Sequence, residues 1–103
     1  KVAGQSIGDL LDLLKHPING IRQRARVELS EHPTDKVLAA TDKWIAQLDP
    51  KAKEDAHHFL EALWLYQRND TKNEALLDQV LNSPEEHARI SARTVKQFWD
   101  KNL

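Results

Sequence analysis

The stretch GDLLDLLKHPINGIRQRARVEL, residues 8–29, determines the fold class of this 103-residue chain. Its leucines recur at helical spacing, and Pro17 ends the run because the residue before a proline is driven out of the α region. A second apolar stripe at the same period then contains Ile21, Ala25 and Leu29. The stretch therefore predicts two short helices joined by a tight turn.

The same combination of a capping residue and an apolar stripe recurs along the chain and predicts six helices. We expect these helices to begin near Ser6, Asn19, Thr34, Asp49, Thr71 and Ser83. Thr71 and Glu74 form a candidate capping box, and Ser83-Pro84 is the strongest start signal. No stretch shows the sustained alternation typical of strands. The sequence therefore predicts an all-α fold.

Three prolines mark an internal repeat. Pro17, Pro50 and Pro84 are spaced 33 and 34 residues apart, each at the junction of two expected helices. After the first and third prolines, an alanine and two arginines return at identical offsets: Arg22, Ala25 and Arg26, then Arg89, Ala92 and Arg93. The middle unit has Ala56-His57-His58 in the corresponding helix instead.

This repetition predicts three antiparallel helix pairs stacked in a single domain over residues 1–103. The expected units are about 6–32, 34–68 and 71–101. The repeated alanines, Ala25 and Ala92, suit positions where neighbouring helix backbones approach closely. Trp44, Trp64 and Trp99 fall one per pair and are expected to pack in the core, with Phe98 as the alternative to Trp99 on the last helix.

The repeated residues resemble a HEAT-type α-helical repeat. The resemblance rests on Leu-Leu-Asp-Leu-Leu-Lys-His-Pro, residues 10–17, on the spaced residues Ile21, Arg22, Ala25, Arg26 and Leu29, and on the similar third unit, residues 76–95. It implies a short right-handed α-solenoid.

A narrower resemblance rests on HHFLEALW, residues 57–64, and SPEEHAR, residues 83–89. These runs are similar to helical segments of large exported bacterial proteins of the membrane-bound dehydrogenase type. There, a sugar-dehydrogenase-like β-propeller precedes the helical segment and a c-type cytochrome module follows it. The resemblance implies a non-catalytic spacer or protein-interaction domain, a periplasmic or exported location, and partners that are other domains of the parent chain or a separate protein. The chain is then expected to be a fragment of that larger protein.

Composition narrows the function classes further. Lysine and arginine number 15 against 16 aspartates and glutamates, and this balance argues against a basic nucleic-acid binder. The chain has no cysteine, which excludes disulfides, thiolate catalysis and a Cys-x-x-Cys-His haem attachment within it. A mean hydropathy of −0.66 without a long apolar run argues against membrane insertion. No catalytic motif is present, so we expect neither an enzyme nor a cofactor in this domain.

The arginines are the leading candidate binding residues. Arg22 and Arg26 are four positions apart, as are Arg89 and Arg93, so each pair lies on one helix face. The four side chains could line a groove that binds an anion, a peptide or a nucleic acid. They could instead form a structural ladder with carboxylates, for which Asp12, Asp55 and Asp78 are candidate partners. The sequence favours the ladder, because sixteen acids are available to compensate the charge.

His57 is the remaining candidate. His57 and His58 each have a glutamate four positions away, Glu61 and Glu54 respectively, a spacing that brings two metal ligands together on a helix. The two histidines point about 100° apart, however, and no third ligand is evident. We therefore expect ordinary surface or interface histidines, no metal site and no catalytic residue.

Overall fold

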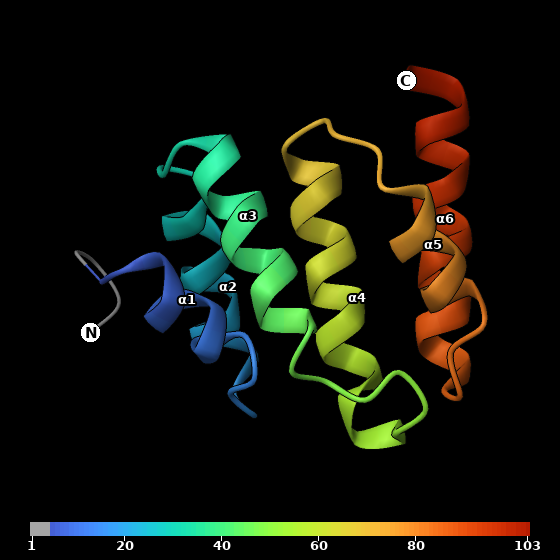
Figure 1. The fold of residues 1–103 in the computed structure, drawn as a ribbon, viewed down its shortest axis with the longest axis horizontal. Helices are drawn as coiled ribbons and strands as arrows, with labels where there is room; N and C mark the ends of the chain where they lie inside the picture. Colours follow the sequence, from blue (N-terminus) through green and yellow to red (C-terminus); the bar gives the residue numbers. More distant parts are fainter. Residues whose placement is uncertain (1–4) are drawn as a thin grey trace. The chain divides into compact units, whose positions relative to one another are not determined.

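The computed structural model describes residues 5–103, and within them the chain forms six α-helices and no strand (Figure 1). This confirms the all-α prediction. The helices are α1 (Ile7–Leu13), α2 (Asn19–Leu29), α3 (Thr34–Ile45), α4 (Lys53–Arg68), α5 (Glu74–Leu81) and α6 (Glu86–Asn102).

The chain divides into two compact units, with the boundary between Gln47 and Leu48. In the first unit, α1 packs against both α2 and α3. In the second unit, α4, α5 and α6 all pack against one another. The finer arrangement as three antiparallel pairs in a solenoid stays a prediction.

The first unit is built on the leucines of α1 and the alanine of α2. Leu10, Leu11 and Leu14 are at most 1% exposed, as their helical spacing predicts. Each such leucine contributes about 1.5–3 kcal/mol through burial. Ala25 is fully buried, which confirms the expectation for this small residue.

The second unit buries half of the residues of α4 and one face of α6. On α6 the buried residues recur at helical spacing: Ala88, Ala92, Val95 and Trp99. Trp99 is 1% exposed whereas Phe98 is 38% exposed, so Trp99 is the core aromatic residue of this helix. The reason is register, because Trp99 follows Val95 by four positions and shares its face.

Helix starts are where sequence expectations fail most often. Ser6 is confirmed, since its Oγ accepts the backbone N–H of Asp9 at 3.2 Å. Asn19 is wrong as a cap, because it is already the first residue of α2 and Ile18 is the N-cap. Ser83 is also wrong as a cap, because the Glu85 side chain caps α6.

Two further starts are displaced. The first turn of α4 begins at Lys53, after a separate turn that contains Asp49 and Pro50. Thr71 belongs to the end of α4: its N–H donates to the Tyr66 carbonyl, and Asp70 before it has a left-handed φ of 51°. The cap of α5 is Asn73 instead, which accepts the Leu76 N–H at 3.0 Å.

Candidate functional site

The candidate arginine Arg22 holds the turn between α1 and α2. Its Nη1 donates to the carbonyl oxygens of His16 at 2.7 Å and Pro17 at 3.0 Å. Its Nη2 donates to the Asn19 side chain at 3.2 Å. The same turn is closed locally, because the Ile18 N–H donates to Nδ1 of His16 at 3.1 Å. The residue before the proline therefore accepts two hydrogen bonds, one through its side chain and one through its carbonyl.

The turn between α5 and α6 repeats this pattern with different residues. The Glu85 N–H donates to Oγ of Ser83 at 3.1 Å, and Nη1 of Arg89 donates to the Ser83 carbonyl at 2.8 Å. Both bonds connect the same relative positions as in the first turn. We use the term turn brace for the bond between the residue before the proline and the side chain six positions later.

The middle proline turn has a brace of opposite polarity. The Lys51 N–H donates to Oδ1 of Asp49 at 2.9 Å, which is the same local closure. Six positions after Asp49 stands Asp55, and its carboxylate accepts the Asp49 N–H at 2.9 Å. Asp55 thus occupies the place of Arg22 and Arg89 but accepts where they donate. Sequence reasoning missed this role, although the common offset from the residue before the proline could have revealed it.

The braces change the interpretation of the first arginine of each pair. Arg89 bonds a backbone carbonyl, and within residues 5–103 it forms no ion pair, so the expected carboxylate partner is missing for it there. Its acceptor is a backbone carbonyl oxygen. Every residue has such an oxygen, so a search of the sequence for acidic residues could not identify this partner. A hydrogen bond from a charged guanidinium is stronger than one between neutral groups. Arg22 and Arg89 are both half-buried.

The second arginines, Arg26 and Arg93, differ from each other. Arg26 is half-buried, and its Nη1 donates to the Gln23 side chain at 2.7 Å. Arg93 is exposed, and within residues 5–103 it makes no hydrogen bond or ion pair. Arg22 and Arg26 lie on α2 in the first unit, whereas Arg89 and Arg93 lie on α6 in the second. A groove formed by all four stays the alternative hypothesis.

His57 contacts a buried carboxylate on α4. Its Nε2 lies 2.8 Å from Oε2 of Glu61, whose side chain is fully buried, while the His57 side chain is 40% exposed. The His57 ring also meets the Trp64 ring edge-on, with centroids 6.0 Å apart. A buried carboxylate needs donors, because desolvation penalises its charge. His57 therefore stabilises the buried side of α4 through its contact with Glu61. The four-residue spacing in the sequence indicated this pair, but it did not indicate that Glu61 is buried.

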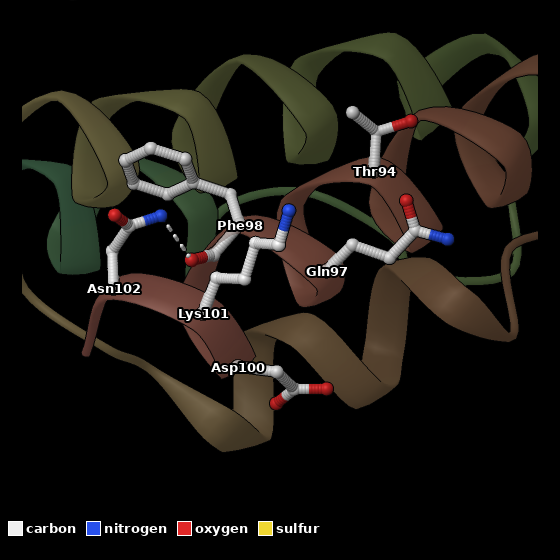
Figure 2. Close-up of a pocket in the computed structure, with 6 residues that line it drawn as sticks. All are labelled: Thr94, Gln97, Phe98, Asp100, Lys101 and Asn102. Atoms are coloured by element: carbon white, nitrogen blue, oxygen red, sulfur yellow. Dashed lines mark hydrogen bonds between the residues drawn. The ribbon is translucent and has the colours of Figure 1, made fainter.

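Neither metal-ligand sets nor a convergent pocket accompany these residues. In the described part of the chain, no three histidines or carboxylates gather as metal ligands do. A hollow of about 550 Å³ lies on the outer face of α6, and Figure 2 shows its lining: Thr94, Gln97, Phe98, Asp100, Lys101 and Asn102. All six come from one helix, and Asn102 donates to the Phe98 carbonyl of that helix. The hollow is a helix surface without groups converging from different elements.

A second hollow, about 390 Å³, lies between α1 and α3 in the first unit. Asp12 lines it from α1, and Lys43 and Trp44 from α3. The Lys15 ammonium lies 5.6 Å from the Trp44 ring centroid, an intramolecular cation–π contact. The Trp44 indole therefore already has an ammonium group over one of its faces.

Two electrostatic features distinguish α6. Glu85 accepts the N–H groups of Ala88 at 2.9 Å and His87 at 3.1 Å, and these bonds lower the pKa of its carboxyl. On the exposed face, Lys96 donates to Asp100 at 2.8 Å, which raises the pKa of Lys96 and lowers that of Asp100. Both features are interactions within one helix, so they stabilise α6 itself.

No helix in residues 5–103 combines the length and apolarity needed to cross a membrane. No protein-family model, curated protein sequence or solved structure matches the chain.

Proposed function

We propose that the chain is a non-catalytic helical-repeat domain that spaces or docks the other domains of a larger exported dehydrogenase or haem protein. Its six helices are proposed to form three antiparallel pairs in a short right-handed solenoid of HEAT type. In this proposal the domain catalyses no reaction and needs no cofactor. Its partners are other domains of the parent chain or a separate protein.

The turn braces carry this proposal. Arg22 and Arg89 are the first arginines of the repeated pattern, and both direct Nη1 at a carbonyl of their own turn. A groove for anions would instead leave these guanidinium groups to the ligand. Residues that recur because they fix a turn favour a structural module. The parent protein and its exported location rest on the resemblance of residues 57–64 and 83–89 alone.

The alternative is a module that binds an anion, a peptide or a nucleic acid. Arg93 is the observation that favours it, because this exposed cation makes no bond within the described residues. A single exposed arginine supplies little of the multiple phosphate contacts from which nucleic-acid affinity is built. Exposed arginines are also ordinary surface residues.

Anionic probes separate the two functions. The wild type, R93A and R26A would be titrated with inorganic phosphate, a polyglutamate peptide and a random DNA duplex at physiological ionic strength, with binding followed by calorimetry. The structural proposal expects no saturable binding by any of the three proteins. Saturable binding that R93A or R26A removes, with the melting temperature unchanged, would support the binding module and contradict our proposal.

A further inference from the structure

The local closure of the α1–α2 turn depends on a titratable acceptor. The Ile18 N–H donates to Nδ1 of His16 at 3.1 Å. A backbone N–H can only donate, so this bond requires a lone pair on Nδ1, which a neutral imidazole with its proton on Nε2 offers. The sister turn uses the hydroxyl oxygen of Ser83 at the same distance of 3.1 Å, and a hydroxyl accepts whatever the pH.

We propose that acid opens the hydrogen bond between Ile18 and His16 and so loosens the α1–α2 turn. The corresponding bond to Ser83 in the α5–α6 turn is expected to stay unchanged between pH 8 and pH 5. A protonated imidazole carries hydrogen on both ring nitrogens and accepts no hydrogen bond. The Ile18 N–H and the Nδ1–H would then be two donors facing each other, so one of them must turn away. The proton therefore binds only when this closure is open.

The position of Ile18 transmits the opening to a helix. Ile18 is the N-cap of α2 and has no side-chain capping bond of its own. Its carbonyl accepts the first N–H groups of α2, from Ile21 at 3.2 Å and Arg22 at 3.3 Å. Arg22 also braces the carbonyl of His16. Loss of the Ile18–His16 hydrogen bond thus loosens the first turn of α2, which also contains the bracing residue Arg22.

Arg22 is the charged group that the structure places against His16, because its Nη1 donates to the His16 carbonyl at 2.7 Å. A guanidinium stays charged between about pH 5 and 8, where imidazole changes charge. It repels an imidazolium and so offers no attraction that compensates the lost bond.

The test compares the wild type with H16N and H16S by amide NMR between pH 8 and pH 5. Asparagine and serine offer a side-chain oxygen at this position and do not titrate, and H16S copies the sister turn. The other four histidines are common to all three proteins. In the wild type we expect the Ile18 amide shift to follow the His16 ring, with its protection from exchange, corrected for intrinsic rates, falling about two- to tenfold. In both variants we expect constant protection.

The Lys51 amide serves as an internal reference, because it donates to Asp49 in the equivalent closure of the middle turn. Spectra at pH 8 check that the variants fold, and if they do not, the wild-type series with Lys51 still decides. Parallel loss of Ile18 protection in the wild type and H16N would overturn the proposal. Unchanged Ile18 protection while the His16 ring titrates would overturn it as well.

Discussion

The α1–α2 and α5–α6 pairs share their turns but differ in how the second helix begins. Both turns have a closure to the residue before the proline and an arginine brace. The N-cap of the second helix is Ile18 in one pair, with no side-chain capping bond, and Glu85 in the other, whose side chain accepts two backbone N–H groups. The comparison teaches that the bond pattern of the turn recurs while its residues and the adjoining cap vary.

The middle proline turn extends this lesson. It retains the closure through Asp49 and the brace position through Asp55, with donor and acceptor exchanged. A turn needs one bond across it, and either a cation on the carbonyl or a carboxylate on the N–H supplies that bond. The donor and the acceptor therefore exchange places between these turns, whereas the two positions that the bond joins stay the same.

The largest effect should come from the small residue that both pairs bury. Ala25 and Ala92 are each 0% exposed, so A25L and A92L should each lower the free energy of unfolding by about 1–3 kcal/mol through overpacking. Urea unfolding of both variants measures this. If only one variant is destabilised, the two pairs do not share a packing requirement at this position.

The cap of α6 should come next. E85A should cost about 0.5–2 kcal/mol, the usual range for a lost N-cap. Because the folded pKa of Glu85 lies below its ordinary 4.5, the unfolded chain binds the proton more readily. The carboxylate's contribution is thus present above that value and is lost as pH falls through the folded pKa. The wild type and E85Q should differ at neutral pH and converge in acid, and a constant difference would contradict this account.

The reversed brace tests whether polarity matters. D55A should lower the unfolding free energy by about 0.5–1.5 kcal/mol, because the Asp49 N–H loses its acceptor. D55N keeps an oxygen acceptor and should retain most of that stability. Thermal unfolding of the two variants compares them, and equal losses would show that the charge, rather than the hydrogen bond, is what counts at this position.

The smallest effect should be a gain. Ile18 is 58% exposed, so I18D removes little packing and supplies α2 with the side-chain cap that it lacks. The expected gain is about 0.5–1 kcal/mol. A decrease in the melting temperature would mean that the uncapped start of α2 is required by the turn, and that the two pairs differ for a structural reason.

Several features could be predicted from the sequence. Helical spacing gave the six helices and the burial of Leu10, Ala25 and Ala92, since periodicity determines which face is apolar. The starts at Thr71 and Ser83 failed, because several polar residues near each start can cap and the backbone decides among them. A capping residue in the sequence therefore predicts the approximate place of a helix start and not its exact position.

The candidate site shows the limit more sharply. The equal spacing of Arg22 and Arg89 from their prolines could be read from the sequence. Their acceptors could not, because they are backbone carbonyl oxygens, which every residue has. Asp55 was hidden for a related reason: comparison by residue identity cannot match a cation to the carboxylate that replaces it. The spacing of His57 and Glu61 was informative, yet burial of Glu61 depends on packing around α4.

The central claim is that the first arginine of the repeat holds its turn, and R89A against R93A tests it most directly. Both arginines lie on α6 four positions apart, but Arg89 bonds the Ser83 carbonyl whereas Arg93 is exposed. Urea unfolding should give a loss of about 0.5–2 kcal/mol for R89A and a change within about 0.5 kcal/mol for R93A. Equal effects of the two variants, or a larger loss in R93A, would contradict the account.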